Sequence, residues 1–292
     1  MNRVIPKKAT RRIGLSRALS KLGYCSRSQA AQLIRAGRVR LNEVVRFDPE
    51  TPVHLTRDRI LVEDRPIEAG EKIYLMMNKP HGLITTVADE KGRETVYSLL
   101  KRSGFAAKGV DSLRGASTRD SSAWVNPVWV APVGRLDKAS EGLLLLTNDS
   151  EWGARVSAPE THLPKTYHVQ IARVADEALI GALTVGVNVA GNSGASSGEK
   201  SDEKSGDAET LRASEARLLR SGQKNCWLEI ILTEGKNRQI RRMLQALGID
   251  VLRLVRIAIG PLQLGKLAKG DYRRLTTDEI NSLDRAMQAR IP

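Results

Sequence analysis

The chain has 292 residues, 41% of them apolar and 27% charged, and a formal net charge of +14 at pH 7. This length allows one large or two ordinary domains with an ample core. No apolar stretch reaches the roughly 20 residues that span a bilayer, so a membrane-spanning protein is not expected. Cys25 and Cys226 lie far apart, with no CxxC pair and no clustered histidines. This argues against a disulfide framework and a metal site.

The positive charge is concentrated near the amino terminus. Residues 1–60 hold 14 basic and 4 acidic side chains, and the first acid is Glu43. Such a segment attracts a polyanion. An anionic membrane would favour an amphipathic helix with Trp or Phe, which is absent here, so nucleic acid is the expected partner. Residues 1–12 are expected to be a basic arm without the apolar block of a secretory signal. The cytoplasm is therefore the expected compartment, and an organelle-targeting role for the first residues stays open.

Two short helices and a hairpin are expected after the arm. Apolar residues at helical spacing over 15–22 predict a helix that Gly23 ends. Ser26 is a suitable N-cap for a second helix, and residues 39–41 alternate as in a strand. The arginines expected on the solvent side are Arg17, Arg27, Arg35, Arg38 and Arg40.

Residues 13–60, with the skeleton SR…A…LI…G.V, resemble an S4 domain, the small module that docks on structured RNA. The resemblance implies a small α/β RNA-binding domain, which with its linker extends over residues 13–70 and is tethered flexibly. Glu43 stands where the family commonly has Gly. Because Asn42 can itself adopt positive φ, the turn is expected to survive. Residues 61–72 are expected to form the linker.

A second domain is expected from residue 71 onwards. KIYLMMNKPHGLITT predicts a buried strand, and Pro80 with Gly82 predicts a turn at its end. Lys79 and His81 would lie at that turn, and His81 receives no role. KGRETVYSLL predicts a loop that leads into a short helix.

Two polar stretches, residues 101–127 and about 190–208, are expected to be surface insertions. Between residues 191 and 207, 15 of 17 residues are Gly, Ser, Glu, Asp or Lys. Such a composition cannot bury enough apolar surface to fold, so the second insertion is expected to be disordered.

The stretch VGRLDKASEGLLLLTND places Asp137 behind an arginine and ahead of four leucines, Leu143–Leu146. The apolar run, which ends in a turn signal, favours a strand buried on both faces, although a helix segment is possible. Asp137 would then be held by a rigid element and still be reachable, as a reactive group must be. Considered alone, the pattern around Asp137 favours a turn or cap residue over a catalytic one.

Two further stretches supply context for Asp137. LPKTYHVQI alternates as a strand with Tyr167 in its middle. Residues 228–232 predict another strand, followed by the loop EGKNRQ and a helix that ends at Gly248. The helix begins with Arg238, Arg241 and Arg242. Arginines and free backbone amides at a helix amino terminus attract phosphate.

Three motifs together, GRLDKASEGLLLLTND, KTYHV and EGKNRQIRRM…VLRLVRIAIGPLQLG, are similar to the RsuA/RluB/RluE/RluF group of ribosomal RNA pseudouridine synthases. The resemblance covers about residues 71–285 and implies a catalytic domain over 71–292. It implies an α+β fold with a mixed, largely antiparallel sheet, and the isomerisation of uridine without metal or cofactor. The partner would be ribosomal RNA or a ribosome-assembly intermediate, and a monomer is expected. The 23S RNA is favoured, while SEWGARVSAPE with Trp152 keeps 16S RNA as the alternative.

The resemblance also implies residue roles. Asp137 would be the catalytic carboxylate, Tyr167 would stack on the flipped base, Arg241 would pair with Asp137 and keep it ionised, and Arg135 would hold the nucleotide backbone. Whether Asp137 attacks C1′, attacks the uracil ring or acts through a glycal stays open. Further RNA contacts are expected from Lys79, Lys165, Arg238 and Arg242.

Two rival functions stay open. A non-enzymatic S4-type RNA-binding protein would need none of these catalytic residues. A glycosidic hydrolase would need a paired acid and nucleophile. Glu141, four residues after Asp137, is the candidate partner, although no clear helix aligns the two.

Overall fold

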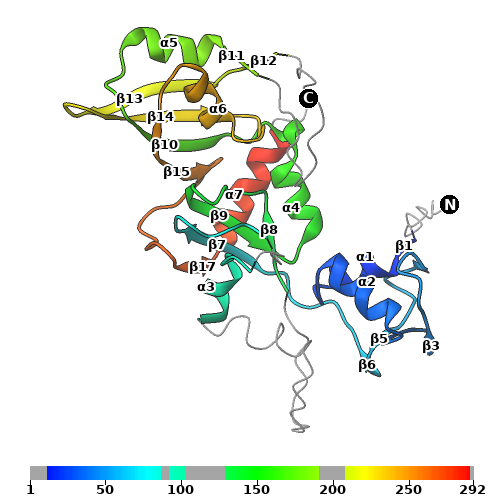
Figure 1. Ribbon diagram of the computed structural model, residues 1–292. Helices are drawn as coiled ribbons and strands as arrows, with labels where there is room; N and C mark the ends of the chain where they lie inside the picture. The colour runs from blue at the N-terminus through cyan, green and yellow to red at the C-terminus, as the bar shows by residue number, and fades with distance from the viewer. Residues whose placement is uncertain (1–11, 87–91, 103–128, 191–207, 290–292) are drawn as a thin grey trace, which may run out of the picture.

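The computed structural model describes residues 12–86, 92–102, 129–190 and 208–289. Figure 1 shows a small amino-terminal unit and a larger unit built on one long sheet. The arm predicted at the amino terminus, apart from residue 12, and both predicted insertions, apart from their first or last residues, lie outside the described residues.

The amino-terminal unit packs two helices against short strands. Both predicted helices form, and the second begins at Ser26, whose hydroxyl accepts from the Gln29 amide at 3.2 Å. The Gln29 side chain accepts in return from the Ser26 amide at 3.1 Å, which completes a capping box. The elements are β1 (Ile13–Gly14), α1 (Leu15–Lys21), α2 (Arg27–Arg35), β2 (Val39–Leu41), β3 (Val44–Val45), β4 (Pro52–Val53), β5 (Ile60–Val62) and β6 (Arg65–Pro66).

The linker predicted at residues 61–72 is partly wrong, because its first half belongs to this unit. Strand β5 pairs with β2 in antiparallel register, with Val62 opposite Val39. All three residues of β5 are buried. A turn at Glu63 and Asp64, both with positive φ, then returns the chain into β6.

The small unit makes specific contacts with the larger one, which a free tether would lack. Lys21, at the end of α1, forms an ion pair with Glu151 in the larger unit. The amide of Trp129 donates to the carbonyl of Gly23 at 3.0 Å. The two units therefore touch at these two points in this structure, and the flexible attachment expected from the sequence stays a prediction.

The larger unit is a mixed sheet whose strand order is β13-β14-β10-β15-β9-β7-β17, with β8 on β9 and β16 on β15. Every pair in it is antiparallel except β15 with β9, so the predicted α+β class with a largely antiparallel sheet is confirmed. Its strands are β7 (Tyr74–Lys79), β8 (Ala131–Val133), β9 (Glu141–Thr147), β10 (Lys165–Ile171), β13 (Glu215–Ser221), β14 (Cys226–Leu232), β15 (Val251–Ile259), β16 (Leu262–Gln263) and β17 (Tyr272–Arg274). The other elements are α3 (Tyr97–Arg102), α4 (Ser150–Ser157), α5 (Glu177–Val185), a hairpin of β11 (Val187–Val189) and β12 (Glu209–Leu211), α6 (Gln239–Ala246) and α7 (Thr277–Gln288).

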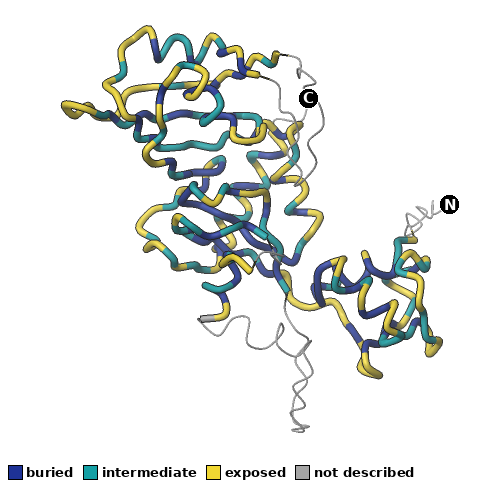
Figure 2. Tube along the Cα trace, in the orientation of Figure 1, coloured by how far each residue is buried: buried dark blue, intermediate teal, exposed yellow. Residues whose placement is uncertain are grey.

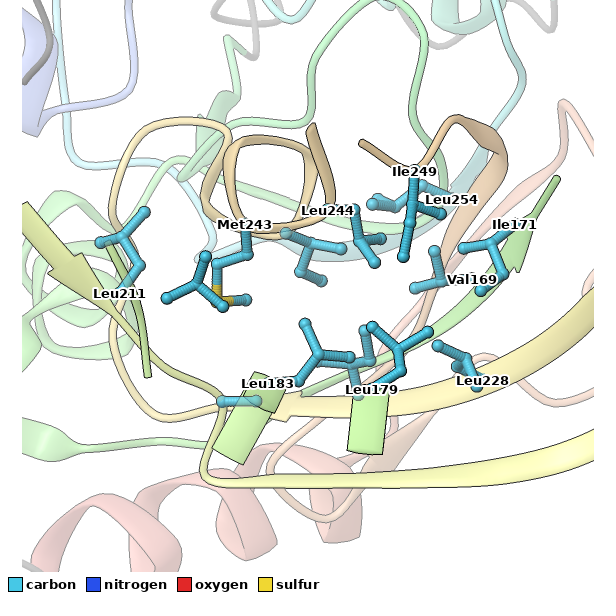
Figure 3. Close-up of a cluster of buried hydrophobic side chains, with 14 of the residues drawn as sticks. Val169, Ile171, Leu179, Leu183, Leu211, Leu228, Met243, Leu244, Ile249 and Leu254 are labelled. Carbon is cyan, nitrogen blue, oxygen red and sulfur yellow. The ribbon is translucent and has the colours of Figure 1, made fainter. Parts of the chain in front are cut away.

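Three apolar clusters hold this sheet. Helices α5 and α6 pack on β10 and β14, as Figure 3 shows for Leu179 and Leu183 opposite Met243 and Leu244. Strand β9 lies between the other two clusters, because Leu143 and Leu145 face one and their alternating neighbours face the other. The strand is buried along its whole length (Figure 2). The prediction of a strand buried on both faces is confirmed, and the element that follows Asp137 is the most enclosed of the sheet. No helix in the described residues is long and apolar enough to cross a membrane.

Candidate active site

Asp137 lies in the loop between β8 and β9, and main-chain hydrogen bonds fix this loop. The amide of Ser140 donates to the Asp137 carbonyl at 3.0 Å. The hydroxyl of Thr85 donates to the carbonyl of Leu136 at 2.8 Å. The Asp137 side chain is 34% exposed, so its carboxylate is held by the scaffold and remains reachable.

Lys79 binds main-chain carbonyls of the same loop. Its ammonium group donates to the carbonyls of Ser140 at 2.7 Å, Asp137 at 3.0 Å and Pro80 at 3.2 Å. The residue is fully buried. Burial lowers the pKa of Lys79 to about 8, although the charges of Asp137 and Glu141 oppose the shift. The prediction that Lys79 contacts RNA is wrong, because the side chain is buried and its ammonium group binds three main-chain carbonyls.

Gly142 lets β9 pass beside β15 at very short distance. Its φ is +101°, and a Cβ at this position would lie 2.2 Å from the carbonyl oxygen of Arg256. Only glycine fits such an approach. The close pairing sets the Asp137 loop next to the middle of β15.

Asp137 opens onto a cavity of about 200 Å³ that is lined by all four residues predicted for the catalytic site and its support. This space is several times the roughly 30 Å³ that one water occupies. Tyr167 enters from β10, and Arg256 enters from the directly opposite position on β15. The predicted site residues that line this pocket are Arg135, Asp137, Lys165, Tyr167, Arg238 and Arg241.

The ion pair of Asp137 is made by a different arginine from the one predicted. Arg238, at the left-handed N-cap of α6, places Nη1 3.6 Å from the Asp137 carboxylate. Arg241 instead donates from Nη2 to the carbonyl of Ala139 at 2.9 Å. Burial lowers the pKa of Arg241, as does the nearby charge of Arg238, while Asp137 opposes both. No ion pair joins Arg241 to Asp137 within 4 Å, so that predicted contact is absent.

The other predicted cations divide between the pocket and the surface. Arg135 is exposed at the rim, and Lys165 is partly buried inside, where burial lowers its pKa and the charge of Arg256 adds to the effect. Arg242 forms an ion pair with Glu209 at 2.9 Å, and its side chain is only 14% exposed. The prediction of Arg242 as an RNA contact is not supported, because Glu209 already occupies its guanidinium.

Two carboxylates bear on the hydrolase alternative. Glu141 is 5% exposed and is paired with Arg253 and Lys269, and it does not line the pocket. Glu234 does line the pocket, yet it accepts from the Gln239 side chain at 2.6 Å. The candidate acid four residues after Asp137 is therefore directed elsewhere. Sequence reasoning did not find Glu234, because nothing in EGKNRQ separates a pocket carboxylate from a loop residue.

The amino-terminal arginines also divide into two groups. Arg17, Arg27 and Arg35 are exposed and have no acidic partner within 4 Å among the residues described. Arg38 is paired with Glu63, and Arg40 with Asp64 at 3.1 Å. Both acids lie in the turn between β5 and β6, within the segment predicted as a linker. In the described ranges, no three His, Cys, Asp or Glu side chains gather in a way that could hold a metal ion.

Comparison with known proteins places this geometry in a family. Residues 73–246, more than half of the chain, match the model of the RNA pseudouridylate synthases. The chain belongs to the RNA pseudouridylate synthase family. Residues 14–60 match the S4 domain, so this synthase carries the RNA-binding module that its sequence predicts at its amino terminus.

Relatives of known name cover nearly all of this synthase. An RNA pseudouridine synthase of Aquifex aeolicus is 32% identical over 94% of this chain and 95% of its own length. A Bacillus subtilis protein named ribosomal large subunit pseudouridine synthase B is 30% identical over 92% of this chain and 94% of its own. A crystal structure of a pseudouridylate synthase aligns with a TM-score of 0.54 at 28% identity, over 93% of this chain and 99% of that one.

Proposed function

We propose that this synthase isomerises a specific uridine of ribosomal RNA, in the 23S RNA of the large subunit, with Asp137 as the reacting carboxylate. The observation that carries the proposal is the meeting of Asp137, Tyr167 and a guanidinium in one pocket. The choice of large-subunit RNA is supported by the Bacillus subtilis relative, whose name carries that substrate. The working compartment would be the cytoplasm, where an assembling ribosome offers the RNA.

The isomerisation of uridine requires a carboxylate held close to the sugar. The N1–C1′ bond breaks, the uracil turns, and C5 bonds to C1′. One proton leaves C5 and one is gained at N1, so no atom is lost and no electron is exchanged overall. Bond breaking develops positive character at the sugar, which the Asp137 carboxylate stabilises or captures. In this proposal the flipped nucleotide enters the cavity next to Asp137.

Neighbouring side chains would then take separate parts. Tyr167 stacks on the uracil, and Arg238 holds the Asp137 carboxylate through the 3.6 Å contact. Arg241 positions the loop by its bond to the Ala139 carbonyl. Arg135, exposed at the rim, contacts the backbone of the extruded strand.

The amino-terminal unit would add affinity for the surrounding RNA. Its exposed Arg17, Arg27 and Arg35 have no acidic partner within 4 Å among the described residues, and the ion pair of Lys21 with Glu151 joins this unit to the catalytic unit. Two linked contacts on one RNA bind more tightly than either does alone.

The small-subunit RNA stays the alternative target. Trp152, in the motif that supports this alternative, is 2% exposed and packs edge-on against Tyr74 with ring centroids 4.9 Å apart. Trp152 is thus a core residue of α4.

Pseudouridine mapping would test both the activity and the target. Ribosomal RNA from cells that lack the gene is compared with RNA from cells that carry wild-type protein or the Asp137→Asn variant. We expect one 23S position to lose pseudouridine in the deletion and in the variant, and to regain it with wild-type protein. A lost position in 16S RNA would contradict the subunit, and full modification by Asp137→Asn would contradict the role of Asp137.

A further inference from the structure

Polar atoms without partners gather in the catalytic pocket. Among the described residues, seven buried side-chain nitrogen or oxygen atoms have no hydrogen-bond partner. Three of them belong to pocket-lining residues, namely Oε1 of Gln239, Nε of Arg241 and Nη2 of Arg256. A buried polar group left without a partner costs about 1–3 kcal/mol, so native proteins keep few of them. Three of the seven atoms thus belong to residues of a single pocket.

Other hydrogen bonds hold each of the three groups in place. Nε of Arg256 donates to the Leu143 carbonyl at 2.7 Å, and Arg241 is bound to Ala139. The Gln239 amide nitrogen donates to the Arg212 carbonyl at 2.9 Å and to Glu234 at 2.6 Å. Because both of these partners are acceptors, the amide orientation is determined, and Oε1 remains as an acceptor. The pocket therefore offers two donors and one acceptor.

Arg256 is the member of this set with the clearest relation to the base. It is 5% exposed and stands directly opposite Tyr167 across the β10–β15 pair. Side chains at directly opposite positions have Cβ atoms about 4.5–5.5 Å apart. A uracil stacked on Tyr167 would therefore bring its edge close to the Arg256 guanidinium.

We propose that Arg256, Arg241 and Gln239 read the hydrogen-bonding edge of the flipped uracil. The two arginines donate to its carbonyl oxygens, and Gln239 accepts from N3–H. This inference rests on the proposed function of the Asp137 pocket. Uracil presents acceptor, donor and acceptor along this edge, which complements the unpaired set in both kind and number. Cytosine presents an amino donor at C4 and an acceptor at N3, so donor would face donor and acceptor would face acceptor.

The same contacts would act during the reaction. When the C1′–N1 bond breaks, its electron pair passes to the uracil, and the negative charge is shared between N1 and the carbonyl oxygens. Donors already aimed at those oxygens stabilise this charge without reorganisation. Arg256 should therefore matter more for kcat than for the KM of the RNA, since the larger RNA surface supplies most of the binding.

Wild-type enzyme and altered RNAs give the first test. Substrates carry uridine, 2-thiouridine, 4-thiouridine or N3-methyluridine at the target position. Because sulfur is a weak acceptor, at least one thio substrate should react about tenfold more slowly or worse. N3-methyluridine should lose roughly a hundredfold or more, as expected of a site that must hydrogen-bond its substrate. Equal rates for all four RNAs would overturn the proposal.

An enzyme variant gives the second test. Arg256→Met should lower kcat by roughly 10²–10³-fold, as removal of one stabilising donor does, with the KM of the RNA within about threefold. The thio effect at the matching oxygen should disappear in this variant. Arg220→Met is the matched control, since Arg220 is exposed on β13 and does not line the pocket.

The outcomes separate this inference from the proposed function. If Arg256→Met unfolds at lower temperature, the altered RNAs decide with the wild-type enzyme alone. Full kcat in a folded Arg256→Met enzyme would overturn the role of Arg256. If the wild-type enzyme forms no pseudouridine even in unmodified RNA, the result would instead count against the proposed function.

Discussion

The guanidinium of Arg238 lies 3.6 Å from the carboxylate of Asp137, whereas the guanidinium of Arg241 donates to the carbonyl of Ala139. Arg238 thus makes the ion pair with Asp137 that was predicted for Arg241. The Arg238 side chain is 49% exposed and can move with an arriving RNA. Arg241 is held partly buried and ties α6 to the loop that carries Asp137.

This division predicts unequal effects on the rate. Arg238→Met should slow single-turnover pseudouridine formation by about tenfold, because an exposed ion pair contributes little. Arg241→Met should slow it by roughly a hundredfold, because a misplaced reactive group loses about that much. Rates at saturating enzyme measure both effects. The reverse order would show that Arg238 is the main electrostatic partner in the reacting complex.

Gly142 predicts a second, structural dependence. A Cβ at this position would meet the backbone of Arg256 at 2.2 Å, so Gly142→Ala should lower the free energy of unfolding by more than about 2 kcal/mol. Gly181→Ala is the control, because Gly181 lies within α5 with no atom within 4 Å of the added Cβ. That change should be neutral or stabilise by up to about 1 kcal/mol. Urea unfolding of both variants makes the comparison, and equal stabilities would contradict the close approach.

Lys79 predicts a dependence of stability on pH. Its pKa is about 8 in the folded chain because of burial, against an ordinary value of 10.5. Between pH 8 and 10.5 the unfolded chain binds more protons at this site, so the contribution of Lys79 to stability rises with pH through that window. The unfolding free energy of the wild type minus that of Lys79→Met should rise by up to about 3 kcal/mol across this window. Below pH 8 the difference should stay flat.

The control for this pH series is Lys266→Met, which removes an exposed lysine. Its difference from wild type should not change between pH 8 and 10.5. A flat Lys79→Met series would show that the buried ammonium is charged throughout the window.

Local patterns predicted the elements around the site, since each depends on neighbours in sequence. Ser26 with Gln29 forms the expected capping box, and Leu143–Leu146 form the strand buried on both faces. The helix of Ile240 and Met243 likewise follows its apolar spacing. The meeting of Asp137 and Tyr167 in one pocket came from the family resemblance, because no periodicity relates residues on different strands.

Contacts that depend on three-dimensional approach were not predictable. Arg238 and Arg241 are three residues apart on the same helix turn, so only the position of the Asp137 loop selects between them. Lys79 is the last residue of β7, and the sequence around it predicts a surface cation. Only the folded chain brings the carbonyls of Asp137 and Ser140 to its ammonium group. Arg256 lies in a strand with alternating burial. The sequence alone does not distinguish a residue that lines a pocket from one that faces the core.

The Asn42–Glu43 turn predicts a stabilising substitution. Both residues have positive φ, 50° and 67°, in the two-residue loop between β2 and β3. Asn tolerates this region, but Glu does not do so readily. Glu43→Gly should therefore stabilise the amino-terminal unit by about 1 kcal/mol, since the exposed pair of Glu43 with Arg59 contributes little. Unfolding of the full chain in urea, monitored by hydrogen exchange in β2, measures the effect, and a destabilised variant would refute it.

The exposed arginines of the amino-terminal unit predict a graded salt dependence of RNA binding. Arg17, Arg27 and Arg35 have no acidic partner within 4 Å in the described part of the chain, whereas Arg38 and Arg40 are paired with Glu63 and Asp64. Each of the first three that contacts a phosphate should, when changed to Gln, reduce the slope of log K against log salt by about 0.7–0.9.

The matched comparison is between Arg17, Arg27 and Arg35 changed together and Arg38 and Arg40 changed together. The first variant should flatten the slope by up to about 2–3, and deletion of residues 1–60 should do at least as much. The second variant should change the slope less, because Glu63 and Asp64 already partly neutralise Arg38 and Arg40 in the free protein. Filter binding of a target RNA fragment from 50 to 300 mM salt measures the slopes. Equal slopes for the two variants would mean that RNA displaces Glu63 and Asp64 and uses all five arginines.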